Sequence, residues 1–240
     1  MTGMSLGSTA KRYIRNTWLF PRHIGHIYMR KGVKRAAAYA HGILIDIGCG
    51  HRPYESFFKD RVKKHFGADW PVSKEKARQD ITCDASALPF QNKAAETVLS
   101  TELMEHLEDP NNFLDEVARI LRPGGHLLLS VPFLEPSHEE PRDFYRFTEY
   151  GLRNLLDRHG FEVIAVWERG HWWAVVLGSF IPQALFSWAV RSNRLFRPVM
   201  TLFVLPICAL AQLIGYFMDH VIKPNSKYTL GFFFVAVRRL

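Results

Sequence analysis

The segment Ile43–Gly50, which reads ILIDIGCG, decides the fold of this chain. An apolar run that ends in an acid and two closely spaced glycines is typical of a β-strand entering a tight turn beside a nucleotide-like ligand. Glycine lets the backbone take a positive φ and lets a ligand approach without a Cβ in the way. Because many strand–helix turns also carry Gly-x-Gly, the motif takes its meaning from the residues that follow.

Short apolar strands alternate with helical patterns after this turn. Strands are expected over residues 65–69, 80–85, 96–101, 126–131, 161–167 and 231–237. Helices are expected over three stretches: residues 53–64, a segment capped by Asp109 with Pro110 in its first turn, and a segment between Thr148 and Gly160. This alternation predicts an α/β fold, a Rossmann-like seven-stranded and mostly parallel sheet with helices on both faces.

Residues 171–225 interrupt the alternation between the sixth and seventh strands. Two apolar runs, Trp172–Val190 and Val199–Met218, each have about the length of a membrane-spanning helix. The turn between them carries three arginines: Arg191, Arg194 and Arg197. A spanning hairpin would carry these charges across the membrane, against the positive-inside tendency. The pattern favours a re-entrant or in-plane helical pair, and buried helices covering the active site are the alternative.

The first 45 residues hold the whole net charge of +8. They contain eight of the 31 Lys and Arg residues and no acid, and the remaining 23 basic residues balance all 23 acids. Because Trp18, Leu19 and Phe20 lie among these charges, residues 1–40 are predicted to form a basic amphipathic extension on an anionic membrane surface. A solvated arm that packs on its own domain is the alternative. A nucleic-acid-binding face would be spread through the fold, so no nucleic acid is expected as a partner.

Residues 41–240 are predicted to form one domain that includes the insertion. Hydrophobic residues make up 48% and charged residues 22% of the chain, which excludes a disordered or wholly membrane-embedded protein. The three cysteines have no metal-ligand spacing, so we expect a reducing compartment, no disulfide and no metal. No secretory signal is evident, so we expect a cytoplasmic protein, peripheral or monotopic at the inner face of the cell membrane.

Six motifs in order carry a family resemblance: IDIGCG, GAD, CDASALPF, ELMEHLEDP, LRPGGHLLLSVPF and HEEPRDFYRFT. This set resembles class I S-adenosylmethionine-dependent methyltransferases, in particular the bacterial group called type 11. The resemblance covers residues 43–169 and the final strand, and it implies an enzyme, an antiparallel last strand and S-adenosylmethionine as cofactor. A nicotinamide cofactor is disfavoured because His51-Arg52-Pro53 follows Gly50, without the third glycine of that fingerprint.

The resemblance implies seven cofactor-binding residues: Asp46, Gly48, Gly50, Asp69, Asp84, Ala85 and Thr101. Asp46 and the two glycines would form the turn against the methionine part of the cofactor. Asp69, at the end of the second strand, would accept both ribose hydroxyls, as an acid at that spacing does in dinucleotide folds. Asp84 would accept from the adenine amino group, with Ala85 supplying a backbone contact. Thr101 would lie near the methionine end, or would only pack there.

The catalytic candidates lie in the loop 132–148, at the carboxyl end of the sheet, where ligands bind in open α/β folds. His138 is the candidate base because imidazole exchanges a proton near neutral pH, and a loop-organising role is its alternative. Tyr145 could place its ring near the sulfonium, or could pack as an ordinary aromatic. Arg146 could bind an anionic acceptor, or could pair with Asp143 to shape the loop.

The preferred function is methyl transfer to a lipid-linked or amphiphilic acceptor at the cytoplasmic membrane face. A soluble small-molecule O-methyltransferase, acting on a sugar or secondary metabolite with the apolar helices as a lid, is the first alternative. A non-catalytic membrane-associated binding module is the second, and the intact cofactor motifs argue against it. Position 101 onward reads TELM rather than the tetrad of amino-methylating enzymes, which disfavours nucleic-acid methylation. His106 in that stretch is interpreted as packing beside the cofactor.

Overall fold

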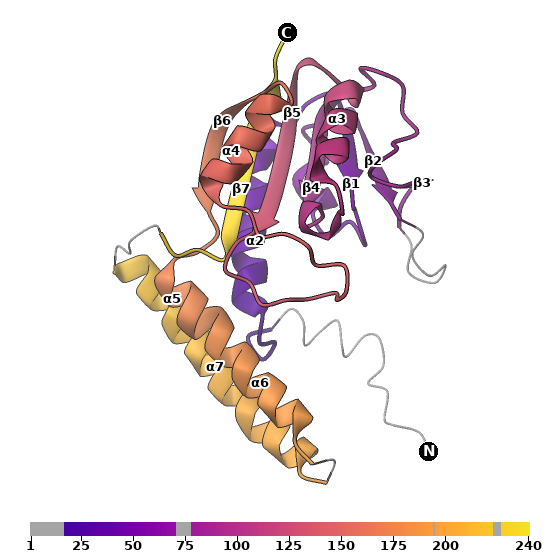
Figure 1. Cartoon of the computed structure of the whole chain (residues 1–240). Coiled ribbons are helices and arrows are strands. Elements are labelled where there is room, and N and C mark those ends of the chain that lie inside the picture. Colours follow the sequence, from indigo (N-terminus) through magenta and orange to yellow (C-terminus); the bar gives the residue numbers. More distant parts are fainter. Residues whose placement is uncertain (1–16, 71–77, 194, 223–226) are drawn as a thin grey trace. The chain divides into compact units, whose positions relative to one another are not determined.

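The computed structural model describes residues 17–70, 78–193, 195–222 and 227–240. The chain divides into two compact units (Figure 1). The sheet unit comprises residues 30–133, 137–168 and 231–240, and the helical unit comprises the chain up to Met29 with residues 134–136 and 169–230. The helix α2, His23–Ala36, begins in the helical unit and ends in the sheet unit.

Seven strands form one sheet in the order β3-β2-β1-β4-β5-β7-β6. They are β1 Ile43–Ile47, β2 Lys64–Asp69, β3 Ile81–Thr82, β4 Ala95–Thr101, β5 Leu121–Pro132, β6 Phe161–Glu168 and β7 Gly231–Arg238. β1 pairs in parallel with β2 and β4, whereas β7 runs antiparallel between β5 and β6. The predicted α/β fold, with an antiparallel last strand, is therefore confirmed. The carboxyl ends of β1, β2 and β4 meet at one edge.

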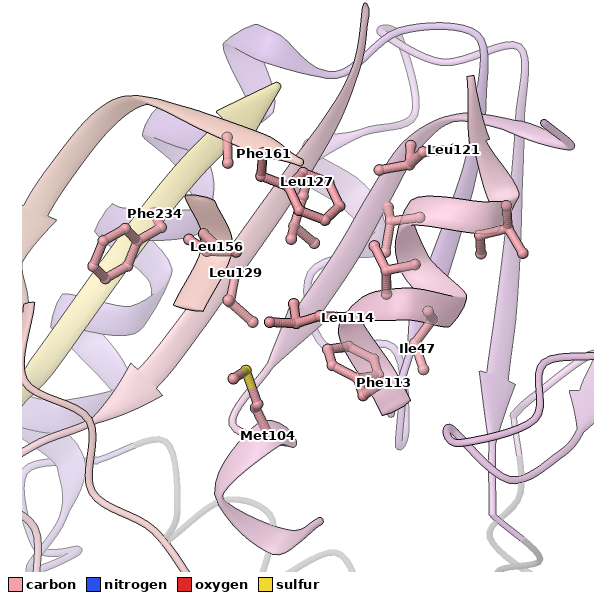
Figure 2. Close-up of a cluster of buried hydrophobic side chains, with 14 of the residues drawn as sticks. Ile47, Met104, Phe113, Leu114, Leu121, Leu127, Leu129, Leu156, Phe161 and Phe234 are labelled. Carbon is pink, nitrogen blue, oxygen red and sulfur yellow. The ribbon is translucent and has the colours of Figure 1, made fainter. Parts of the chain in front are cut away.

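Two capped helices cover one face of this sheet, α3 Pro110–Ile120 and α4 Glu149–Arg158. The Asp109 carboxylate accepts from the Asn111 N–H at 2.9 Å, and Thr148 Oγ1 accepts from the Gly151 N–H at 3.1 Å, so both predicted caps form. Figure 2 shows Phe113 and Leu114 of α3 in the cluster of buried side chains that fills this layer. The apolar side chains that alternate along the strands form the other half of that cluster.

The second half of α2 packs on the opposite face. A Cβ on Gly32 would lie 3.0 Å from the Phe233 ring and 3.2 Å from the Trp167 indole nitrogen, so the helix backbone touches β6 and β7 closely. The Trp167 and Phe233 rings stack with centroids 5.4 Å apart, and the Arg35 guanidinium lies over Trp167 at 5.2 Å. A short 3₁₀ turn, η1 Ala37–Tyr39, then leads into β1. Helices on both faces are thus confirmed.

The expected helix over residues 53–64 does not form. The segment has one helical element, the 3₁₀ turn η2 Glu55–Phe57, and the residues on both sides of it form turns. Its amide hydrogen bonds mostly reach back three residues, as from Phe58 N to Glu55 O at 3.1 Å. Phe58 is the one aromatic side chain that this segment buries, whereas Tyr54 and Phe57 stay half-buried, so the segment has no continuous apolar face that would favour a helix. The helical spacing of its aromatic residues was therefore misleading.

Both apolar runs of the insertion are helical, as predicted. The helical unit contains α5 Trp172–Val175, the π-helical turn η4 Val176–Phe180, α6 Ile181–Arg191 and α7 Arg197–Val221. Residues 172–191 and 197–221 are each long and apolar enough to cross a membrane, by length and composition alone. α6 and α7 pack side by side through a small cluster formed by Ala189, Val204 and Cys208 (Figure 1).

Two buried polar side chains of α7 hold the N-terminal segment within the helical unit. Gln212 accepts from the Ile24 N–H at 3.1 Å and donates to the carbonyls of Trp18 and Phe20, each at 3.0 Å. Asp219 accepts from the Tyr28 hydroxyl at 2.5 Å, and burial raises the pKa of that phenol well above its usual range. Residues 17–29 of the expected extension are therefore packed, and its residues 1–16 lie outside the described residues. The domain boundary at residue 40 stays a prediction.

Candidate active site

The glycine turn after β1 has the backbone that a ligand cradle needs. Gly48 and Gly50 have φ of +72° and +50°, in the region that favours glycine. The Gly48 N–H donates to the Ala68 carbonyl of β2 at 2.9 Å, which fixes the turn against the neighbouring strand. A Cβ on Gly48 would lie 3.1 Å from the Leu103 side chain, whereas one on Gly50 would enter open space. Gly50 therefore presents bare backbone to whatever lies above the turn.

Asp46 lies below this turn rather than at its surface. Its residue is only 3% exposed, and its Oδ2 lies 3.5 Å from His65 Nε2. Burial raises the pKa of the Asp46 carboxyl, and the neighbouring His65 opposes that effect. The predicted contact between Asp46 and the methionine part of a cofactor stays a prediction.

Asp69 connects the end of β2 to the glycine turn. Its Oδ2 accepts from the Gly50 N–H at 2.7 Å and its Oδ1 accepts from the Trp70 N–H at 2.8 Å. Because each carboxylate oxygen can accept more than one hydrogen bond, both oxygens keep capacity for the hydroxyls of a ribose. The structure thus brings together three of the predicted cofactor-binding residues, Gly48, Gly50 and Asp69.

Asp84 and Ala85 lie just after β3, the strand that pairs with β2. Asp84 Oδ1 accepts from the Ser86 N–H at 2.8 Å, an Asx turn that leaves the carboxylate exposed. Cys83, next to it, donates its N–H to the Asp69 carbonyl at 2.9 Å. Burial raises the pKa of the Cys83 thiol, and the nearby carboxylates of Asp69 and Asp84 add to that effect. Both acids therefore lie on the same edge, on either side of one thiol.

Thr101 ends β4 and stands in register with Ser130 of β5. The Ser130 hydroxyl donates to Glu102 Oε1 at 3.1 Å, and Glu102 takes a left-handed φ of +50°, which turns the chain sharply at this edge. Ser100, one residue earlier, pairs with Ile47 at the entrance of the glycine turn. Thr101 is therefore at the same edge as the cradle.

These residues fit S-adenosylmethionine. The bare backbone of Gly50 leaves room for close approach, and Asp69 offers two oriented acceptors to a ribose. Asp84 supplies a further exposed acceptor for an exocyclic amine. Acids in these positions also suit a cationic sulfonium ligand, because their charge is opposite.

Arg146 and Asp143 form the most tightly bonded pair in the loop after β5. Arg146 Nη1 and Nη2 donate to the two Asp143 oxygens at 2.6 and 2.7 Å, a bidentate pair. This guanidinium holds the pKa of the Asp143 carboxyl well below its usual range, and the His138 N–H bond at 2.9 Å adds to the effect. Arg146 therefore shapes the loop, which is the alternative that its spacing from Asp143 indicates.

Tyr145 is tied to the chain after β4. Its hydroxyl donates to the Glu108 carbonyl at 2.9 Å, and its ring lies 5.8 Å from the Phe147 ring. The N–H groups of Phe144 and Tyr145 both donate to the Glu105 carbonyl, at 2.9 and 3.3 Å. The loop that carries the catalytic candidates is thus fastened to the short turn η3, Met104–His106.

His138 faces a second histidine that sequence reasoning left in a packing role. The rings of His106 and His138 meet edge to face with centroids 5.0 Å apart, and the side chain of Glu105 beside them is fully buried. His138 Nδ1 lies 3.6 Å from Asp143 Oδ2, too far for a hydrogen bond but close enough for the charge to favour one ring orientation. The adjacency of Glu and His in the ELMEH motif is the only sequence signal for this cluster.

Trp70 and Arg142 are further residues that the sequence analysis missed. Trp70 follows Asp69 directly, and its ring is 52% exposed. The Arg142 guanidinium lies 5.9 Å from the centroid of that ring, within the range of a cation–π contact. An exposed aromatic next to the acid that is predicted to bind a ribose is well placed to contact a nucleoside. Its position after the GAD motif could have indicated this.

Comparison with known proteins agrees with this geometry. Residues 22–166 match the profile of a family described as "Methyltransferase domain". A protein of Mycolicibacterium smegmatis, described as a probable S-adenosylmethionine-dependent methyltransferase, is 29% identical over 133 residues, 50% of this chain and 52% of that protein. The malonyl-[acyl-carrier protein] O-methyltransferase of Hahella chejuensis is 32% identical over 99 residues, 37% of this chain and 36% of that enzyme. The chain therefore spans about half the length of the first relative and less of the second.

Solved structures share the fold at low identity. A chain in the complex of the Haloferax volcanii Trm112 methyltransferase activator with a methyltransferase is 17% identical, with a TM-score of 0.61, over 97% of this chain and 95% of that chain. The [4+2]-cyclase SpnF is 18% identical, with a TM-score of 0.57, over 88% of this chain and 81% of that chain. Because a cyclase is among these neighbours, the fold alone does not identify the reaction.

Proposed function

The chain belongs to the methyltransferase-domain family, which uses S-adenosylmethionine, and on this premise we propose that it methylates a lipid-linked or amphiphilic acceptor at the cytoplasmic face of the cell membrane. The observation that carries the proposal is the distribution of side chains on α7. Its buried residues include the polar Gln212 and Asp219 and the small Gly215, whereas large apolar side chains face outward. A helix surrounded by water has the opposite arrangement.

The outward face of α7 is apolar along its length. The most exposed of its large side chains are Leu202, Phe203 and Phe217, which are 70%, 68% and 66% exposed. On α6 and in the α6–α7 turn, Trp188 and Leu195 are 61% and 77% exposed. Soluble monomers rarely carry a continuous apolar surface of this extent, and such a surface commonly marks a membrane or protein contact.

The charges of the helical unit favour a lipid surface over a protein partner. Arg191 ends α6 and Arg197 begins α7, so cations flank the apolar helices where phospholipid headgroups would meet them. The N-terminal segment adds further basic residues and no acid. Basic groups near an anionic leaflet contribute about 1 kcal/mol each to binding. Insertion from one side, without carrying the arginines across, is the arrangement we propose.

The sheet unit supplies the reaction. Bound S-adenosylmethionine would provide an electrophilic methyl group, and methyl transfer needs mainly an acceptor held in line with it. We assign the acceptor atom to oxygen, which agrees with the O-methylation named for the Hahella relative. The proton of a hydroxyl acceptor would pass to His138, whose backbone N–H is held by Asp143. Arg146 keeps the Asp143 carboxylate in place through its bidentate pair.

Label transfer tests this proposal. The protein is incubated with methyl-tritiated S-adenosylmethionine and a cell extract, which is then split into membrane-lipid and soluble fractions. Label in the lipid fraction should fall to background in Asp69→Ala, because the ribose loses its acceptor, and should persist in Asp115→Ala, which removes an exposed carboxylate of the same unit. Label confined to the soluble fraction would contradict the membrane acceptor and favour a small soluble one. No label that depends on Asp69 in either fraction would contradict the enzymatic proposal.

A further inference from the structure

Three potential metal ligands converge at the carboxyl edge of the sheet. Glu105, His106 and His138 each offer one ligand atom, and these atoms all lie within 4.8 Å of one another. The Glu105 side chain is fully buried, and those of His106 and His138 are 15% and 17% exposed. Two chain segments build the cluster, the turn η3 after β4 and the loop after β5, and backbone hydrogen bonds to the Glu105 carbonyl hold them together.

A backbone carbonyl sets the orientation of the His106 ring. Its Nδ1 lies 2.5 Å from the Arg142 carbonyl, and because a carbonyl can only accept, the proton is on Nδ1. In the neutral ring, Nε2 then carries a lone pair. That nitrogen lies 3.8 Å from Glu105 Oε1 and 4.0 Å from Glu139 Oε2. A cation placed among these atoms would be attracted both to the lone pair and to the carboxylates.

We propose that Glu105, His106 and His138 bind a divalent transition-metal ion of the Zn²⁺ type. Two imidazoles and one carboxylate are the ligand set that such ions prefer, and three protein ligands leave a position open. Zinc–ligand distances of about 2.0–2.2 Å would draw the three atoms together by roughly an ångström. A histidine whose second nitrogen donates to a backbone carbonyl is the usual arrangement around such ions, because it fixes the ring and its tautomer. Exposed Glu139 is within reach as a further ligand.

The ion would change how the acceptor is activated, and this role rests on the proposed function, whereas the binding does not. If an acceptor hydroxyl bound at the open position of the ion, the cation would favour its deprotonated form. His138 would then hold the ion, and the acceptor proton would pass to solvent instead of to the imidazole.

Cobalt titration provides a readout that needs no activity. The full-length protein, in detergent and stripped of metal by a chelator, is titrated with Co²⁺, and the visible absorption bands of the bound ion are followed. Zn²⁺ is then added to compete. We expect saturable binding at one ion per chain and loss of the bands when Zn²⁺ displaces Co²⁺. Affinity should fall at least about tenfold in His106→Gln and in Glu105→Gln.

His159→Gln is the matched control, because His159 pairs with Asp115 and is not one of the three proposed ligands. Circular dichroism and S-adenosylmethionine binding check that each variant is folded. His106→Gln keeps the test decisive if burial makes Glu105→Gln unstable. Absence of a saturable band, or an affinity for Co²⁺ that is unchanged in His106→Gln, would overturn the proposal. Metal binding without any labelled product would contradict the proposed function alone.

Discussion

Helix α3 of the sheet unit and helix α7 of the helical unit distribute their side chains in opposite ways. The residues that α3 buries are all apolar, from Phe113 to Ile120, and its polar residues face outward. α7 buries Gln212 and Asp219 and exposes residues such as Leu202 and Phe203. The difference supports the proposal that water surrounds α3 and that an apolar medium surrounds the outward face of α7.

Truncation in the sheet unit should have the largest effect on stability. Phe113 is fully buried in the layer between α3 and the sheet, so Phe113→Ala leaves a cavity and should cost about 3–5 kcal/mol. Phe203→Ala removes the same atoms from an exposed position on α7 and should cost less than about 0.5 kcal/mol in detergent. Hydrogen exchange of the β5 amides measures the cost of Phe113→Ala, and hydrogen exchange of the α7 amides measures the cost of Phe203→Ala. Similar costs for the two phenylalanines would break the comparison.

Membrane affinity, unlike stability, should depend on the exposed side chains of α7 more than on residues of the sheet unit. Placing two charges on the outward face of α7, in Leu202→Glu with Phe203→Glu, removes apolar side chains worth about 1.5–3 kcal/mol each when buried. We expect at least a tenfold weaker partition onto vesicles that contain anionic phospholipid, measured by flotation. Ile164→Glu with Tyr150→Glu is the matched control, since both are exposed apolar residues of the sheet unit. Equal loss in the two pairs would show that α7 has no special role.

Much of the sheet unit could be predicted because its signals are local. The period of apolar residues identified the strands, and Asp109 and Thr148 marked helix starts through bonds that span two or three residues. The segment 53–64 misled because the spacing of its aromatic residues does not show which of them the fold buries. The gathering of the candidate cofactor residues at one edge could be predicted from the order of the motifs, because the carboxyl ends of parallel strands meet at that edge.

The cluster of Glu105, His106 and His138 could not be predicted from local sequence patterns. His138 lies 32 positions after His106, and only the pairing of β4 with β5 brings the two segments together. The role of Gln212 was hidden for a similar reason, because its partners Trp18, Phe20 and Ile24 are distant in sequence. Sequence shows a polar residue that interrupts an apolar run, and structure shows which backbone groups it satisfies.

The polar interior of the helical unit should respond to loss of a single amide. Gln212→Leu keeps the size of the side chain but removes the partner of the Ile24 N–H and of the Trp18 carbonyl, whereas the Phe20 carbonyl keeps its bond from the His23 N–H, so the change should cost about 1–3 kcal/mol. Because Ile24 lies in the first turn of α2, faster hydrogen exchange of residues 23–27 should report the change. Gln183→Leu is the control, since this glutamine of α6 bonds only one turn back along the chain, to Ser179 of η4 at 2.6 Å. Equal protection in both variants would contradict the capping role of Gln212.

The smallest effect is expected from a polar contact at the rim of the sheet unit. Glu116 accepts from Arg119 at 2.7 Å and from the Leu88 N–H at 2.7 Å, and mainly the Arg119 bond lowers the pKa of its carboxyl in the folded state. A carboxyl whose pKa is lower when folded stabilises the fold above its unfolded value of about 4.3, and this contribution is lost as the pH falls through the folded value. The pair is partly exposed, so it should contribute about 1 kcal/mol or less. Melting temperatures of the wild type and Glu116→Gln should therefore differ near pH 7 and converge under acid. If the difference in melting temperature grew on acidification, the Glu116 carboxylate would oppose folding. The outward-facing polar residues of α3 would then not all stabilise the helix.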